Sequence, residues 1–220
     1  MTIQLYLDHR SGSCRRVMAV AKHLSLDLEE VFVDLLAGGT QTEDFLALNP
    51  AAMVPVMTHD RPEGSKLVLT EAAAIMIYLC EQHPGQTLWP ATDDRIEVLK
   101  WMFWAAEHFR PPAPVYFEEK FIAPLMGGQE NGPRLAEAER QVERHAPVLD
   151  AHLSGRDYVV GETVTLADYD LAAALSQMSR SHVPYDRYPN IMRWAAHLEQ
   201  TNAAWRDTGM LLNSRMSQVA

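Results

Sequence analysis

Cysteine is scarce in this chain of 220 residues, which contains only Cys14 and Cys80. Two cysteines are too few for the disulfide framework of a small secreted protein, and they fit a reducing compartment. The chain starts directly with a strand-like segment at residues 3–7, without the basic start and long apolar stretch of a secretory leader. These absences predict a cytoplasmic protein.

Clustered positive charge is also missing. The formal net charge is −10 and the longest run of basic residues is Arg15-Arg16, so nucleic acid and anionic membranes are not expected as partners. No apolar run is long enough to span a bilayer. The nine histidines are scattered and show no metal-ligand spacing, so no metal is expected.

Apolar residues are plentiful, at 47% of the chain, which predicts a sizeable core and argues against global disorder. The first third alternates between strand and helix patterns. Apolar strands are predicted at residues 3–7 and 28–35, with a helix from Arg15 between them, which indicates a right-handed parallel strand–helix–strand unit. A short helix at residues 42–48, strands at 54–58 and 66–69 forming an antiparallel hairpin, and a helix at 71–82 follow.

The composition changes at a segment rich in proline and glycine, residues 83–92. Beyond it the only strand-like stretch is residues 158–160. Helices are predicted at residues 93–109, 116–125, 133–153 and 191–200, and Thr165 with Asp168 is typical of a capping box at the start of another helix. The sequence therefore predicts an α/β domain at 1–82, a linker at 83–92 and an all-helical domain at 93–220.

Pro55 interrupts an apolar run after Val54. Proline removes a donor from a strand ladder, so it occurs at edges, bulges or strand starts. Two interpretations remain open. Pro55 is either an ordinary edge-strand proline or part of a buried turn, where a cis peptide bond is most plausible.

Several motifs occur in the order and spacing of one known family. They are Leu5-Tyr6-Leu7-Asp8 followed by Ser11, Cys14, Arg15 and Val17; Asp34-Leu35-Leu36-Ala37-Gly38; Phe45-Leu46-Ala47-Leu48-Asn49-Pro50; Val54-Pro55-Val56; Leu69-Thr70-Glu71 with Ala74, Ile75, Tyr78 and Leu79; and Thr165-Leu166-Ala167-Asp168. With these motifs nearly the whole chain resembles the cytosolic glutathione S-transferases, nearest to the theta class and related bacterial enzymes.

The resemblance implies a thioredoxin-like N-terminal domain that binds glutathione as co-substrate, a helical-bundle C-terminal domain that shapes a pocket for a small apolar electrophile, and a homodimer. Glutathione reacts as its thiolate. Lowering a thiol pKa by two units requires roughly 2.7 kcal/mol of anion stabilisation. A serine hydroxyl and the positive end of a helix supply about that. The family match assigns this catalytic role to Ser11, which on spacing alone is a turn or N-cap serine.

Ser13 and Cys14 are rivals for the contact with sulfur. Cys14 falls near the first turn of the helix, where the helix dipole favours a thiolate. In some relatives a cysteine near this loop supports reduction chemistry, whereas in theta-like sequences the cysteine at this position is often a packing residue. Cys80 lies within an apolar helix pattern and is expected to be buried.

The resemblance also implies the residues that contact glutathione. The backbone of Val54, beside Pro55, pairs with the cysteinyl unit, Glu71 faces the γ-glutamyl ammonium, and the N–H of Ala72 holds the γ-glutamyl carboxylate. Thr40, Gln41 and Met53 occupy the remaining contact positions. Here the chain departs from the family, which usually has serine at Ala72, often has His or Lys at Thr40-Gln41, and has Lys or Gln at Met53.

The expected electrophile pocket lies between the Ser11 loop and the first long helix of the second domain. Of the aromatic residues on that helix, Trp104 and His108 are the best candidates because they are four apart on one face. Most aromatics at helical spacing are core residues, and His108 is otherwise a hydrogen-bonded structural histidine.

These observations predict a glutathione transferase with Ser11 as catalytic residue. A glutathione-dependent disulfide reductase or peroxidase is the alternative enzyme. A non-catalytic binding module with the same fold is the alternative from another class, because Thr40, Gln41, Met53 and Ala72 replace the usual donors.

Overall fold

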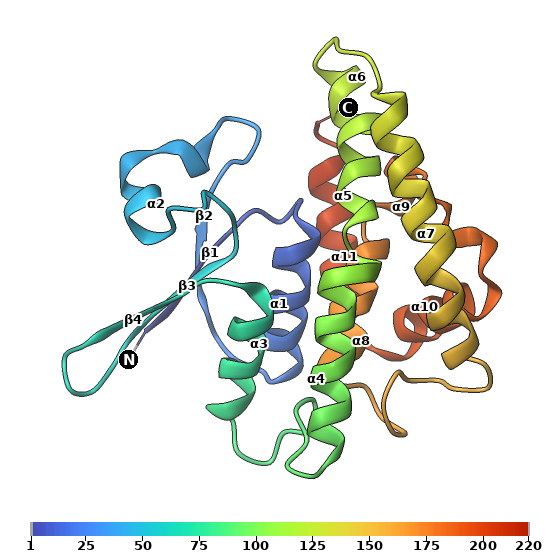
Figure 1. The fold of residues 1–220 in the computed structure, drawn as a ribbon. Coiled ribbons are helices and arrows are strands. Elements are labelled where there is room, and N and C mark those ends of the chain that lie inside the picture. Colours follow the sequence, from blue (N-terminus) through green and yellow to red (C-terminus); the bar gives the residue numbers. More distant parts are fainter. Residues whose placement is uncertain (1, 220) are drawn as a thin grey trace. The chain divides into compact units, whose positions relative to one another are not determined.

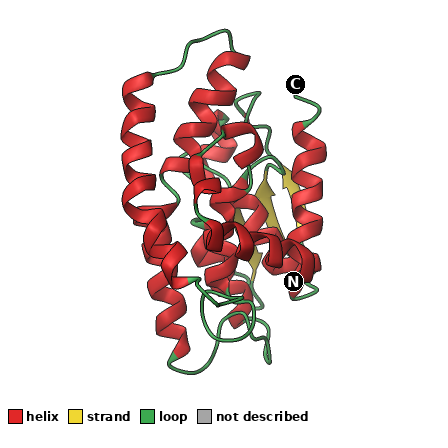
Figure 2. Cartoon of the chain, turned by 90° about the vertical axis from the view of Figure 1, so that its right-hand side faces the viewer, coloured by secondary structure: helices red, strands yellow, loops and turns green. Residues whose placement is uncertain are grey.

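A computed structural model describes residues 2–219. The chain divides into two compact units, one formed by residues up to 86 together with 207–219 and the other by residues 87–206. The strands gather in a single sheet, and helices and loops make up the rest of the described chain (Figure 2). Within residues 2–219, no helix is both long enough and apolar enough to cross a membrane.

The first unit holds the whole sheet. Its elements are β1 (Ile3–Leu7), α1 (Gly12–His23), β2 (Glu29–Phe32), α2 (Glu43–Leu48), β3 (Val56–Asp60), β4 (Lys66–Leu69) and α3 (Ala72–Glu81). The strand order is β2-β1-β3-β4, with β1 and β2 parallel and the other two pairs antiparallel. The predicted parallel strand–helix–strand unit and the predicted hairpin are both confirmed.

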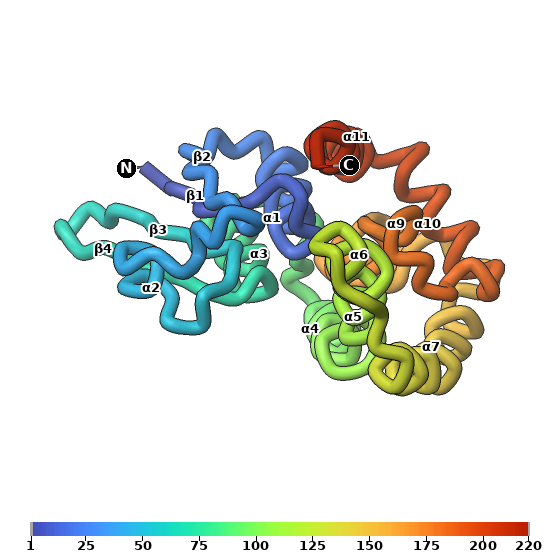
Figure 3. Tube along the Cα trace, turned by 90° about the horizontal axis from the view of Figure 1, so that it is seen from above, coloured from blue at the N-terminus to red at the C-terminus, as the bar shows by residue number. Residues whose placement is uncertain are grey.

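Alternation along the strands divides the core between the two faces of this sheet. Tyr6 and Val56 pack with Phe45 of α2 on one face. Leu5 and Leu7, both fully buried, point to the opposite face, where α1 and α3 lie side by side (Figure 1, Figure 3). Two helices on one face and one on the other give the thioredoxin-like arrangement that was expected.

Several boundaries in this unit differ from the sequence prediction, and three of the differences have a local cause. Helix α1 begins at Gly12 rather than Arg15, because Ser11 caps it. Strand β3 begins at Val56 rather than 54, since the preceding proline has no N–H to donate to a ladder. Strand β2 ends at Phe32, because the carbonyl of Asp34 already accepts a turn hydrogen bond of 2.7 Å from Gly39.

The second unit is helical, as predicted. Its helices are α4 (Asp94–Trp104), α5 (Pro112–Phe117), α6 (Ala123–Leu125), α7 (Gly132–His152), α8 (Leu166–Ala172), α9 (Met178–Ser181) and α10 (Pro189–Thr201). Helices α4 and α5 continue through π-helical turns, at Ala105–Phe109 and Glu118–Ile122 respectively. A further helix, α11 (Ala203–Met216), was not predicted, and its residues from Asp207 onward belong to the first unit.

The capping box at the start of α8 is confirmed and is fully buried. The carboxylate of Asp168 accepts hydrogen bonds from the backbone N–H of Thr165 at 2.8 Å, from the N–H of Val159 at 2.9 Å and from Trp194 Nε1 at 3.0 Å. The strand suspected at residues 158–160 is wrong for the same reason. Val159 satisfies its backbone groups with Asp168 and with His152 instead of a partner strand.

Candidate functional site

The segments that carry the predicted glutathione contacts meet at one edge of the sheet, which here means the edge formed by the strand ends where β1 finishes. The last residues of β1, β2 and β4 and the first residue of β3 lie near this edge. The register that establishes it pairs Leu7 with Phe32, Tyr6 with Val56 and Met57 with Leu69. Loops that leave parallel strands at their carboxyl ends therefore meet the N-termini of α1 and α3.

Each predicted residue of the first unit can be placed relative to this edge. Ser11 follows β1, and Thr40 and Gln41 follow β2 in the 3-10 helical turn Gly39–Gln41. The pair Val54–Pro55 directly precedes β3, with Met53 before it. Glu71 and Ala72 follow β4 at the start of α3. The sheet register thus brings the strand ends next to these segments, which lie between Ser11 and Ala72 in the sequence, to one edge.

Ser11 is the N-cap of α1. Its backbone is extended, with φ −84° and ψ 125°, and its Oγ accepts a hydrogen bond of 3.4 Å from the backbone N–H of Cys14. A hydroxyl that accepts in this way keeps its own hydrogen to donate. The N-cap role and donation to an anion are therefore compatible in one side chain, at the positive end of a helix.

Cys14, the rival nucleophile, is completely buried. Burial raises the pKa of the Cys14 thiol to about 12, although hydrogen bonds from its surroundings act in the opposite direction. At neutral pH the side chain is thus a neutral thiol without access to solvent. Cys80 is also buried, and its pKa is likewise raised to about 12 by burial. Neither cysteine has the exposed, low-pKa character of a reactive thiol.

The loop before β3 is held by Asn49, a buried residue from the motif at residues 45–50. Asn49 Nδ2 donates to the carbonyl of Met53 at 2.7 Å, and Asn49 Oδ1 accepts from the N–H of Ala51 at 3.1 Å. The Val54–Pro55 bond is cis, so the turn interpretation of this proline is confirmed. Among residues 2–219, no hydrogen bond partner is found for the backbone N–H and C=O of Val54.

Helix α3 begins without a side-chain cap. Its N-cap residue, Glu71, is exposed and has φ +67° and ψ 111°, a conformation that side-chain-bearing residues rarely adopt. No side chain in the described chain caps the first amides of the helix, beginning with Ala72. The result is a set of N–H donors suited to a carboxylate, beside an exposed anion suited to an ammonium group.

The remaining predicted contacts are neutral. Thr40 is buried, whereas Gln41 is exposed and its N–H donates to the carbonyl of Gly38 at 2.8 Å. The side chain of Met53 is exposed, and its carbonyl is already taken by Asn49. Thr40 and Gln41 thus have a hydroxyl and an amide that could face an anion, Met53 has no side-chain donor, and none of the three side chains is cationic.

Sequence reasoning gave no role to a cluster of charges around Asp8 and Arg10. Asp8 is fully buried, and Arg10 Nη2 donates to its Oδ2 at 2.6 Å. Burial alone would raise the pKa of Asp8, but hydrogen bonds from the side chain and backbone of Arg10 and from the backbone of Leu35 outweigh it and hold that pKa below its ordinary value. The signal in the sequence was an acid directly after an apolar strand.

In the second unit the two predicted pocket residues lie together. The ring centroids of Trp104 and His108 are 6.0 Å apart in an edge-to-face arrangement. His108 also stacks on His145 of α7, with centroids 4.7 Å apart, and burial is the main cause that lowers the pKa of His145. His108 is exposed and Trp104 half-buried, so this pair is accessible on the surface of its helix.

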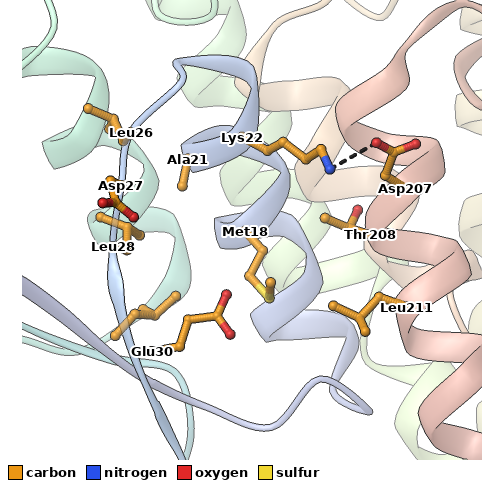
Figure 4. A pocket seen from close by; sticks show the side chains of 11 residues that line it. Met18, Ala21, Lys22, Leu26, Asp27, Leu28, Glu30, Asp207, Thr208 and Leu211 are labelled. Carbon is orange, nitrogen blue, oxygen red and sulfur yellow. Dashed lines mark ion pairs between the residues drawn. The ribbon is translucent and has the colours of Figure 1, made fainter.

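A pocket of about 320 Å³ lies elsewhere in the first unit. Leu5 and Met18 contribute to an apolar part, and Lys22 of α1 reaches toward Asp207 of α11, forming an ion pair of 2.8 Å (Figure 4). Its lining includes Leu28 and Glu30 near the start of β2, which is the opposite end of that strand from the edge described above. None of the predicted site residues lines this pocket.

Comparisons with known proteins match both parts of the chain. Residues 10–82 match the family model of the glutathione S-transferase N-terminal domain, and residues 114–202 match that of the C-terminal domain. The chain is 35% identical to glutathione S-transferase 3 of Zea mays over 171 residues, which cover 76% of this chain and 73% of that protein. It is 31% identical to glutathione S-transferase theta-2 of Mus musculus over 206 residues, covering 90% and 81% respectively.

A solved structure of a glutathione transferase family member from Pseudomonas fluorescens superposes with a TM-score of 0.82 at 25% identity, covering 94% of this chain and 92% of that one. That protein was crystallised with two glutathione molecules bound. Two domain models in the family's order and relatives above 30% identity over most of their length establish that this chain belongs to the glutathione S-transferase family and is a glutathione transferase enzyme.

Proposed function

We propose that the chain transfers the thiolate of glutathione to an electrophilic carbon of a small apolar substrate, and that Ser11 stabilises the thiolate. The hydroxyl of Ser11 donates its hydrogen to the sulfur, while its oxygen still accepts the hydrogen bond from the N–H of Cys14. The dipole of α1 adds to this stabilisation, because the sulfur lies over the N-terminus of the helix. Together the two effects supply the roughly 2.7 kcal/mol that a fall of two units in thiol pKa requires.

Glutathione binds along the sheet edge in this proposal. The unpaired backbone groups of Val54 pair with the cysteinyl unit as an added strand. The open amides at Ala72 hold the γ-glutamyl carboxylate, and Glu71 faces its ammonium group. The bound state of the related Pseudomonas fluorescens protein supports glutathione as the ligand.

The glycyl carboxylate of glutathione is left to Thr40, Gln41 and Met53. Because none of these side chains is cationic, the contact relies on neutral hydrogen bonds, each weaker than the charge-assisted bonds that other family members use. The consequence is a weak affinity for glutathione, in the range that is filled only at high cytoplasmic concentrations of the tripeptide. In the second unit, the candidates for contact with an electrophile are Trp104 and His108, whose rings are accessible at the surface of their helix.

The observation that carries the proposal is the meeting of Ser11 and the uncapped start of α3 at one sheet edge. The test is a calorimetric titration with glutathione, followed by conjugation assays with an aryl halide as electrophile. S-methylglutathione is the matched control, because it keeps every contact except the reactive thiol. We expect both peptides to bind and only glutathione to form a conjugate.

Other outcomes of the same experiment select the alternatives. Binding without conjugation, combined with glutathione-dependent reduction of a mixed disulfide, would replace carbon transfer by a reductase function. An absence of heat and of thermal stabilisation at millimolar glutathione would favour a non-catalytic module.

The proposal includes a homodimer in which the first unit of one chain meets the second unit of its partner. Ile96 and Phe103 support it, since they are seven residues apart on one face of α4 and each is 64% exposed. Phe103→Glu should convert a dimer near twice the chain mass of 24.8 kDa into a monomer, as measured by light scattering. A wild-type mass near that of one chain at micromolar concentration would refute the dimer.

A further inference from the structure

The loops after β1 and β2 leave the sheet side by side. The last residues of the two strands, Leu7 and Phe32, are paired, and the N–H of Val33 donates to the carbonyl of Leu7 at 2.8 Å. The first loop ends at Ser11, and the second ends at the turn that carries Thr40 and Gln41. A contact between these loops therefore sets the position of the proposed catalytic hydroxyl relative to the proposed glutathione contacts.

One guanidinium group joins the two loops. Arg10 Nε donates to Asp8 Oδ1 at 2.9 Å and to Asp8 Oδ2 at 3.1 Å, and Nη2 donates to both Asp8 and the carboxylate of Asp34. The Arg10 guanidinium carbon also lies 5.9 Å from the ring centroid of Phe32. Arg10 is thus bound to a residue before Ser11 and to a residue beyond the end of β2 at the same time.

Asp8 reaches across as well. Its Oδ2 accepts a hydrogen bond of 3.1 Å from the backbone N–H of Leu35, while its Oδ1 accepts from the N–H of Arg10 at 2.9 Å. Its backbone carbonyl accepts from the N–H of Ser11 at 2.9 Å. Asp8 is completely buried, so these bonds are shielded from water and are stronger than equivalent bonds on the surface.

Asp34 also forms hydrogen bonds within the second loop. Its carboxylate accepts from the N–H of Leu36 at 3.0 Å and of Ala37 at 3.3 Å, and its carbonyl accepts from the N–H of Gly39 at 2.7 Å. The approach at Gly39 is close, because a Cβ there would lie 2.9 Å from both the backbone N and the backbone O of Asp34. Asp34 therefore fixes the start of the turn that carries Thr40 and Gln41.

We propose that the Asp8–Arg10–Asp34 bridge is a positioning device for the transfer reaction, with Arg10 holding Ser11 and the Thr40–Gln41 turn at a fixed separation. One glutathione molecule must reach both places, with its sulfur at Ser11 and its glycyl end at the turn. A fixed separation lets a single bound conformation satisfy both contacts. This inference rests on the proposed function, because it gives the bridge a catalytic consequence.

Asp34→Asn is the sharpest variant. It removes the charge that binds Arg10 across the loops but leaves the buried Asp8–Arg10 pair in place, and the Asp34 side chain is 42% exposed, so the variant should fold. Glu139→Gln is the matched control, because it removes a carboxylate of 41% exposure that pairs with Arg187 in the second unit.

The first measurement is made without glutathione. Hydrogen exchange should accelerate together at the amides of Ser11 and Gln41 in Asp34→Asn, and at neither amide in Glu139→Gln. Faster exchange confined to residues 36–39 would show that the bridge does not couple the loops, and would overturn the proposal whatever the enzyme does.

The second measurement is kinetic. For Asp34→Asn we expect kcat with an aryl halide to fall about tenfold, and the pKa of the bound glutathione thiol, followed by thiolate absorbance, to rise by about one unit, which is the same free energy. A fall in kcat with an unchanged thiol pKa would reduce the bridge to a structural role. Coupled acceleration of exchange in Asp34→Asn, together with a wild-type chain that forms no conjugate, would instead refute the proposed function, and the catalytic meaning of the bridge with it.

Discussion

Replacing Ser11 by alanine tests the proposed mechanism most directly, because the observed capping role of this side chain and its proposed role as a donor to the thiolate can be separated. As the N-cap of α1, the hydroxyl accepts one rather long hydrogen bond of 3.4 Å from Cys14. Loss of an N-cap costs about 1 kcal/mol, which lowers the melting temperature of a chain of this size by about 2–4 °C. In its proposed role as donor to the thiolate, the hydroxyl contributes a charge-assisted hydrogen bond worth about 1.5–3 kcal/mol.

These magnitudes separate the two roles in the assay. We expect Ser11→Ala to lower kcat for conjugation by about 10²-fold, as is typical for one lost bond to a developing or bound anion. The pKa of bound glutathione should rise by about one to two units, which is the same free energy expressed as a titration. The readouts are initial rates with an aryl halide and the absorbance of the bound thiolate across pH.

Three further variants make the experiment specific. Ser11→Thr keeps both the cap and the hydroxyl and should retain most of the activity. Ser13→Ala, at a half-buried position next to the site, should leave the thiol pKa unchanged. Cys14→Ala opens a small cavity in a fully buried site and should cost stability while leaving turnover within a few fold.

The reverse pattern would refute the reasoning. If Cys14→Ala abolished activity while Ser11→Ala retained it, the thiolate would not depend on the Ser11 hydroxyl. A cysteine-based reduction would then replace carbon transfer.

Three other predictions follow from the geometry. Glu71→Gly should relieve the unfavourable φ of +67° and stabilise the chain by about 1 kcal/mol in thermal unfolding, yet weaken glutathione binding in calorimetry. Glu71→Gln should weaken glutathione binding without the gain in stability. Since the folded-state pKa of Asp8 lies below the ordinary value of 3.8, its bridge to Arg10 stabilises the fold above that pH, and the contribution is lost as pH falls through the folded pKa. Asp8→Asn should therefore lower the free energy of unfolding at neutral pH by about 2 kcal/mol. Its free energy of unfolding, measured with urea, should also fall less steeply toward acid pH than that of the wild type. Asp168→Ala leaves several buried donors without an acceptor and should destabilise the chain by about 3–5 kcal/mol in urea unfolding, while an equal midpoint for the variant and wild type would contradict its capping role.

The sheet and its edge were predictable because their signals are local. Strand alternation at residues 3–7 and the turn between β3 and β4 depend on neighbours in sequence, whereas the sequence around Pro55 left both a cis turn and an edge-strand proline open. The capping box of α8 is equally local, since Thr165 and Asp168 are three residues apart.

The parts that escaped prediction depend on residues distant in sequence. The bond from Arg10 to Asp34 joins positions 24 residues apart, and nothing in either loop alone indicates it. Helix α11 has Gly209 in its interior, which lowers its intrinsic helix propensity by about 1 kcal/mol relative to alanine. Its stability comes instead from the burial of Trp205, Leu212 and Met216 in tertiary contacts, which form only in the folded chain.

The placement of residues 207–219 with the first unit affects how the protein is made. A ribosome releases β1 and α1 well before residues 207–219, which complete their unit. Until residues 207–219 have been synthesised, Met18 and Lys22 lack their neighbours Leu211 and Asp207, so the nascent first unit keeps apolar surface exposed. A fragment limited to residues 1–86 would lack residues 207–219 and keep this apolar surface exposed permanently. Such a fragment would represent the intact unit poorly in binding studies and would be a candidate for chaperone binding.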